Sequence, residues 1–136
     1  MATFNKFNAF AENVAEGVHN LGSNQLRIAL TNTAPVAANS VLADLAEITY
    51  TNLSARNVTT SSSAQTGGVY KLTCADLVLS ASGGSVGPFR YVVLYNDTAA
   101  GDPLIGWYDY GSSITLASGE TLTVDFDQAN GVLTLT

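Results

Sequence analysis

From Leu26 to the end of the chain, apolar side chains recur at every second residue in short runs. Residues 26–30 and 122–126 are the clearest examples. A period of two places the apolar side chains of a β-strand on one face. Turn-forming residues such as Asn130-Gly131 separate the runs about every 8–12 residues. The pattern predicts a mainly β fold over residues 25–136, an antiparallel β-sandwich of about seven to eight strands, and leaves jelly-roll and immunoglobulin-like connectivity both open.

Individual stretches refine this prediction. Residues 89–95 are apolar on both faces, which is typical of a central strand. An aromatic-rich strand is expected at 104–110 and a further alternation at 114–116. The polar run 57–62 suits a sheet edge. The inward-facing residues have even numbers up to Cys74 and odd numbers from Leu77 onward. This change of parity leads us to expect a β-bulge at Ala75-Asp76.

The first 22 residues carry a different period. Their apolar side chains are separated by steps of three and four residues: Phe4, Phe7, Ala11, Val14, Val18 and Leu21. This spacing predicts one amphipathic α-helix within residues 1–22, with Phe7 and Val14 buried against the sheet or a neighbouring subunit. A coiled-coil seam has the same spacing but needs more heptads. Gly17 weakens such a helix by about 1 kcal/mol relative to alanine, and Gly22 fits a C-terminal cap.

Composition limits the possible partners. The chain has 136 residues, which fits a single domain spanning 1–136; 46% of them are apolar and 12% charged. Five Lys and Arg face eleven Asp and Glu, for a net charge of −6, and the basic residues form no cluster. Nucleic-acid backbones and anionic membranes both attract basic surfaces, so we expect neither as a partner.

The single cysteine, Cys74, excludes an internal disulfide and suggests folding in a reducing cytosol. The alternation around it predicts a buried thiol. No run approaches the roughly 18 apolar residues of a membrane span. The N-terminus has no signal-peptide core, so we expect no export by secretion.

No residue pattern predicts a reaction. His19 is the single histidine, and its place near the end of the expected helix favours a surface or capping role. No Gly-x-Ser-x-Gly motif accompanies it. One histidine and one cysteine cannot complete the usual zinc ligand set. We therefore expect that the chain is not an enzyme and holds no cofactor or metal.

A pair of carboxylates is the strongest catalytic alternative. Asp125 and Asp127 lie on one face of their expected strand, and Asn130 follows. Two close carboxylates could act as a glycosidase pair or bind calcium. Because Phe126 and its apolar neighbours form the core face, we expect both aspartates to face solvent at a hairpin.

An aromatic stretch offers a binding alternative. Trp107, Tyr108 and Asp109 lie within the run GWYDYG at 106–111, and such runs can bind sugar rings or a partner protein. Ordinary packing within the core and between strands is the simpler interpretation.

Several longer stretches resemble small virion structural proteins of tailed bacteriophages and prophages. They are FNKF (4–7), GVHNLG (17–22), LRIALTNTAP (26–35), GPFRYVVLYND (87–97), LIGWYDYG (104–111), GET (119–121) and DF (125–126). Within that group the chain is most similar to capsid decoration, or cement, proteins. These are small β-rich proteins that sit on the head shell and hold its capsomers together, and they bring no catalytic residues.

The resemblance implies a structural role in the virion. It also implies that the protein is made in the host bacterial cytoplasm without a signal peptide. The expected partners are the major capsid protein or other virion proteins, and further copies in a homo-oligomer. The candidate interface residues are Phe4, Phe7, Trp107, Tyr108 and Tyr110. A tail tube, baseplate or fibre component is the first alternative, and a carbohydrate-binding module on a virion surface is the second.

Overall fold

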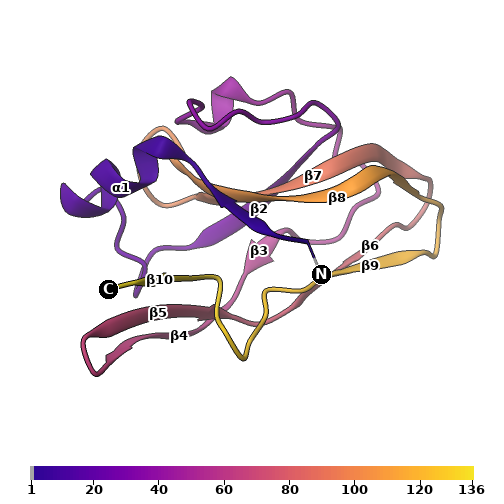
Figure 1. The fold of residues 1–136 in the computed structure, drawn as a ribbon. Coiled ribbons are helices and arrows are strands. Elements are labelled where there is room, and N and C mark those ends of the chain that lie inside the picture. The colour runs from indigo at the N-terminus through magenta and orange to yellow at the C-terminus, as the bar shows by residue number, and fades with distance from the viewer. Residues whose placement is uncertain (1) are drawn as a thin grey trace.

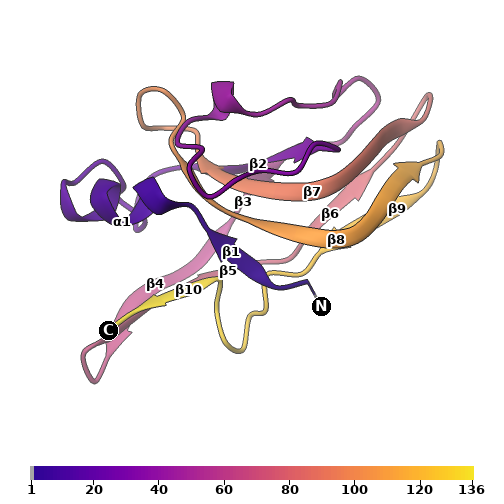
Figure 2. The ribbon, with the colours of Figure 1, turned by 45° about the horizontal axis from the view of Figure 1, so that its top comes forward.

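The computed structural model describes residues 2–136 and is mainly β, with ten strands and one α-helix (Figures 1 and 2). In chain order the elements are β1 (Phe4–Lys6), α1 (Asn8–Ala15), β2 (Leu26–Thr31), the 3₁₀ turn η1 (Leu42–Asp44), β3 (Asn57–Val58), β4 (Thr60–Thr66), β5 (Val69–Cys74), β6 (Leu77–Ser80), β7 (Val86–Asn96), β8 (Leu104–Leu116), β9 (Thr121–Val124) and β10 (Leu133–Leu135).

The largest sheet has five strands in the order β1-β8-β7-β2-β3, all paired antiparallel. Its centre is the long hairpin of β7 and β8, which have 11 and 13 residues. Val93 pairs with both Ala29 and Trp107, and these three residues fix the register across the sheet. The predicted central strand at 89–95 is therefore confirmed.

Two smaller antiparallel sheets, β10-β5-β4 and β6-β9, lie on one side of the large sheet (Figure 1). The chain leaves the first at Cys74 and enters the second at Leu77. The parity change at Ala75-Asp76 is thus a crossing between sheets, and the predicted β-bulge is wrong. Asp76 fixes the crossing, because its Oδ1 accepts the Phe126 N–H at 3.0 Å.

The main core fills the space between the large sheet and the two small ones. It draws on every second residue of the facing strands, which is the period read from the sequence: Ile28 and Leu30 of β2, Leu72 and Cys74 of β5, Leu79 of β6, Val92 and Leu94 of β7, Val124 of β9 and Phe126. All of these side chains are fully buried.

The other face of the large sheet is also apolar and is covered by the segment around residues 42–45, which runs above it in Figure 1. Leu42 and Leu45 of this segment pack against the outward side chains of the sheet. Tyr50 anchors the segment: its hydroxyl accepts the Leu30 N–H at 2.9 Å and donates to Glu47 Oε1 at 2.6 Å. The sheet therefore has a core on both faces.

The predicted helix over 1–22 is much shorter in the structure, and α1 ends at Ala15. Gly17, at φ +78°, ends it. The Gly17 N–H donates to Val14 O and the Val18 N–H to Asn13 O, which is the Schellman pattern of a glycine cap. Val18, expected on the buried stripe, is exposed, whereas Phe7 is fully buried as predicted.

Residues Phe4–Lys6 form strand β1, and not the first helical turn that the spacing predicts. Phe4 pairs with Tyr108 and Lys6 with Gly106 at the edge of β8. Gly106 has no side chain, so the Phe4 ring and the Asn5 carbonyl lie directly against it. This close approach stabilises an extended chain where the local pattern alone favours a helix.

The strand count also exceeds the prediction of seven to eight. β1, β3 and β10 have two or three residues each, too few for alternation to be recognised. The two alternations expected at 104–110 and 114–116 belong to one continuous strand, β8. Among residues 2–136, no helix is long and apolar enough to cross a membrane.

Candidate functional site

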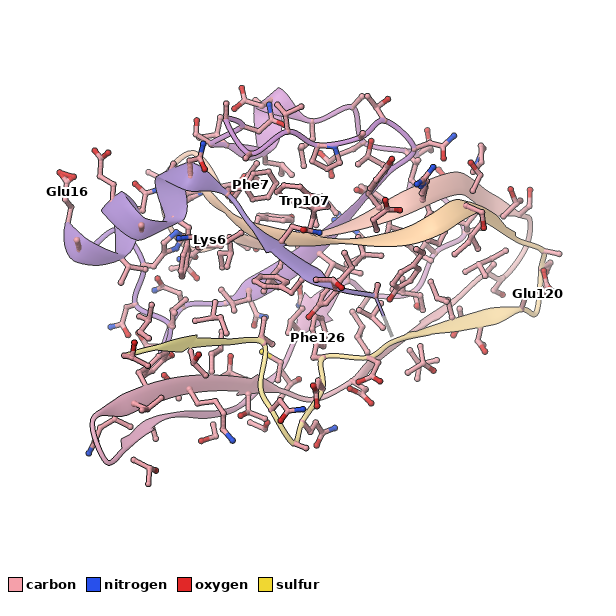
Figure 3. The ribbon with its side chains drawn as sticks, viewed as in Figure 1. Lys6, Phe7, Glu16, Trp107, Glu120 and Phe126 are labelled. Atoms are coloured by element: carbon pink, nitrogen blue, oxygen red, sulfur yellow. The ribbon has the colours of Figure 1, made fainter. Side chains whose placement is uncertain are left out.

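Phe7 and Trp107 meet on the outer face of the large sheet, with ring centroids 4.6 Å apart (Figure 3). Phe7 follows β1, and its N–H extends the pairing by donating to Ile105 O at 3.1 Å. Phe7 is fully buried, while Trp107 keeps part of its surface exposed. Of these two predicted interface residues, Trp107 alone is accessible.

Tyr108 lies on the opposite face of β8, within the main core. Its ring packs on Phe4 at 5.2 Å and on Phe126 at 6.1 Å, and it is 4% exposed. Burial is the main cause that raises the pKa of its hydroxyl. Phe4 and Tyr110 are half-buried beside it. Tyr108 thus serves the core and not an interface.

The predicted sugar platform at 107–109 is not assembled. Trp107 and Tyr108 point to opposite faces of the sheet, as neighbours in a strand must. Asp109 forms a two-pronged ion pair with Arg90, at 2.8 and 3.1 Å, and also accepts the Gly111 N–H. The Arg90 guanidinium, followed by that N–H, lowers the pKa of Asp109. Its carboxylate is thereby committed to joining β7 and β8.

The Asp125 and Asp127 carboxylates organise the loop before β10. Asp125 Oδ1 accepts the Asp127 N–H at 2.8 Å, and Asp127 accepts both the backbone and the side-chain N–H of Asn130. Asp127 has a φ of +52°, which aspartate tolerates when its side chain bonds locally. The Asn130 bonds lower the pKa of Asp127. Both aspartates lie at the surface, as predicted, but in a loop and not at a hairpin, because β9 pairs with β6 and β10 with β5.

The sequence predicts His19 at the surface, but in the structure it is 7% exposed. Asn96 holds it: Asn96 Oδ1 accepts the N–H groups of Thr98 and Ala99, so its amide nitrogen faces His19 Nδ1 at 3.1 Å and Asn24 Oδ1 at 2.8 Å. Nδ1 must accept this bond, which places the ring proton on Nε2. Nε2 is buried and has no hydrogen-bond partner within residues 2–136. Burial lowers the pKa of His19.

An open groove of about 480 Å³ lies beside His19. Its walls are mostly apolar and come from α1, the chain after it, β4, β5 and β10: Val14, Leu21, Ser63, Tyr70 and Leu135 are among them. Ser63 and Tyr70 bond to each other on the β4–β5 wall, with their hydroxyl oxygens 2.8 Å apart. None of the described residues that line the groove is an Asp, Glu, Lys or Arg.

Cys74 lies in the main core, as the sequence predicts. Burial raises the pKa of its thiol to about 11, so the thiol stays protonated at neutral pH. Within residues 2–136, no group of three or more His, Cys, Asp or Glu side chains is placed to hold a metal ion.

Sequence reasoning missed the two polar anchors of the fold, His19 with Asn96 and Tyr50 with Glu47. Both link residues distant in the sequence or lie in a long loop, so no local periodicity reveals them. For comparison with known proteins, no family model, no curated protein and no solved structure matches the chain.

Proposed function

We propose that this chain is a structural protein of a tailed-phage particle, foremost a head decoration or cement protein. In that role it binds the outside of the capsid shell through the major capsid protein and stabilises it. The proposal starts from the resemblance of the stretches 4–35 and 87–126 to such virion proteins.

One structural observation supports a binding role without catalysis. The side chains that chemistry would use are each engaged by the fold: Asp109 by Arg90, Asp127 by Asn130, and His19 by Asn96, while Cys74 is buried. Catalytic groups need a free, accessible face toward a substrate. We therefore propose that the chain is not an enzyme.

The charge of the protein suits the outside of a DNA-filled shell. A net charge of −6 is repelled by packaged nucleic acid, so the shell lining is a poor location for this surface. A low share of charged residues, together with abundant Thr and Ser, suits a protein surrounded by neighbouring subunits.

The contact with the shell uses predicted interface residues that remain accessible on either face of β8. Phe7 and Tyr108 are used by the core, which leaves part of Trp107 free on one face and part of Phe4 and Tyr110 free on the other. Partly exposed aromatic side chains are common anchors of protein interfaces. An interface of about 800 Å² per partner would be ordinary for one copy, and many copies on a closed shell add their effects.

The finer description of the fold belongs to the same proposal. The small sheets facing the large one across a shared core support an antiparallel β-sandwich. Within that proposal, the connectivity is of the jelly-roll or of the immunoglobulin-like type.

Purified protein added to phage heads that lack it tests the role. We expect it to sediment with the heads and to raise the temperature at which they release DNA. Equal thermal stability of heads with and without the protein would contradict the proposal. Immunogold labelling confined to tails would instead favour a tail tube, baseplate or fibre subunit.

A further inference from the structure

Strand β4 is a free sheet edge within residues 2–136. It has seven residues and pairs with β5 on one side, and the sheet order ends there. Besides its bonds with β5, no backbone N–H or C=O of residues 61–66 bonds to another segment of the described chain. The other edge strands of the described sheets are shorter: β1, β3 and β10 have two or three residues each, and β6 and β9 have four.

This edge lacks the features that usually keep sheet edges apart. Natural edge strands are protected by charged side chains, by proline or by a covering loop. The segment Thr60–Thr66 reads TSSSAQT and has neither a charge nor a proline. Its irregularity is confined to the step between Thr60 and Ser62, so 62–66 stays regular. The hairpin of β4 and β5 also projects from the body of the molecule (Figures 1 and 2).

We propose that β4 binds β4 of a second copy of this chain. In this arrangement the two strands run antiparallel about a two-fold axis at Ser63, and two three-stranded sheets become one six-stranded sheet. The proposal concerns self-association and does not depend on the shell-binding role.

The absence of charged side chains along β4 allows a second copy to occupy this edge. Two bodies of net charge −6 repel each other over most approaches, and an uncharged strip of seven residues is where they can meet at least cost. Self-pairing about Ser63 sets Ser62 opposite Ala64, within the regular part of the strand. Both side chains are small and uncharged, which suits neighbouring positions on adjacent strands.

The geometry also limits the assembly to a dimer. A two-fold contact uses the same patch on both copies and closes on itself. The combined sheet then ends at β10 on each side, a strand of three residues that offers little edge for further growth.

Two double substitutions at the same two positions test the pairing. Ser62 and Ala64 are exposed on one face of β4. S62E with A64E sets glutamates opposite each other across the two-fold axis, whereas S62K with A64E sets lysine opposite glutamate. A64E is compatible with the fold because Ala64 pairs with Lys71 within the chain, so the new carboxylate would face an opposite charge. The control S112E with Q128E adds the same charge as S62E with A64E, at exposed positions away from β4.

Sedimentation velocity of the full chain over about a hundredfold concentration range gives the dimer dissociation constant of each protein. We expect dimers for wild type, for the control and for S62K/A64E, and a dissociation constant at least about tenfold higher for S62E/A64E. Circular dichroism and the melting temperature establish that each variant is folded. A wild type that stays monomeric overturns the proposal and leaves the edge to an extended segment of another protein. Equal dissociation constants for the two β4 variants overturn it as well.

Discussion

The amide nitrogen of Asn96 lies 3.1 Å from Nδ1 of His19, and both side chains are buried. The bond joins the chain after α1 to the end of β7, 77 residues later. Because the Asn96 amide donates this hydrogen bond, Nδ1 of the imidazole must carry no proton. Protonation of Nδ1 would place two hydrogen-bond donors opposite each other.

Stability is therefore expected to fall in mild acid. Burial lowers the pKa of His19 in the folded protein below its ordinary value near 6.5. Below about pH 6.5 the unfolded chain therefore binds a proton at His19 that the folded chain does not. The contribution of neutral His19 to stability is complete above about pH 6.5 and is lost as the pH falls toward the pKa of His19 in the folded protein. The melting temperature between pH 7.5 and pH 5 measures it. His19→Gln should flatten that part of the profile, and an unchanged slope would contradict the assignment.

Phe7→Ala should destabilise the protein by about 3–5 kcal/mol, because it empties a fully buried site between Trp107 and the outer face of the large sheet. Urea unfolding measures the change. Ser112→Ala, at an exposed position of β8, is the control and should alter the free energy by less than about 0.5 kcal/mol. A Phe7→Ala protein as stable as the control would show that the ring is not packed as described.

Gly106→Ala should cost about 1–3 kcal/mol, because a methyl group there would lie 2.5 Å from Asn5 O and would also meet the Phe4 ring. The loss should be accompanied by detachment of β1, visible as new amide chemical shifts for residues 4–6. Gly22→Ala is the matched control, since its methyl group would make ordinary contacts of 3.5 and 3.6 Å. Similar melting temperatures for the two variants would contradict the close approach.

Tyr50→Phe should destabilise the protein by about 1–3 kcal/mol, because it leaves the Leu30 N–H without its acceptor and removes the bond to Glu47. The ring would remain under the Arg56 guanidinium, which lies 3.6 Å above its centroid. Limited proteolysis should then cut residues 32–56 faster than in wild type. Equal cleavage rates would indicate that other contacts hold this segment.

Alternation in the sequence was sufficient to predict a mainly β chain and its buried positions. Leu72, Cys74 and Val124 all lie in the core as their parity predicts. It was not sufficient to assign the partner of each strand, because pairing depends on residues far apart in the sequence. The crossing at Ala75-Asp76 and a bulge change parity in the same way, so the pattern alone does not separate them.

The N-terminal segment illustrates a local pattern overridden by tertiary contacts. Phe4 and Phe7 are three residues apart, which fits one face of a helix, yet each is used by a different face of the sheet. Gly106, about a hundred residues away, decides between helix and strand for this segment. Because Gly106 has no side chain, β1 can lie directly against it. The predicted aromatic platform is absent for a local reason: Trp107 and Tyr108 are neighbours in one strand and therefore face opposite layers.

The layer facing the large sheet is divided into two small sheets, joined by Ala75 and Asp76 between β5 and β6 and by residues 125–132 between β9 and β10. Each small sheet packs on its own part of the large one, so either can open without breaking the ladder of the other. Hydrogen–deuterium exchange should therefore separate the chain into three classes. The amides of β7 and β2 would exchange most slowly. The amides of β4–β5 would share one faster rate and those of β6–β9 another, each set by the opening of a single small sheet.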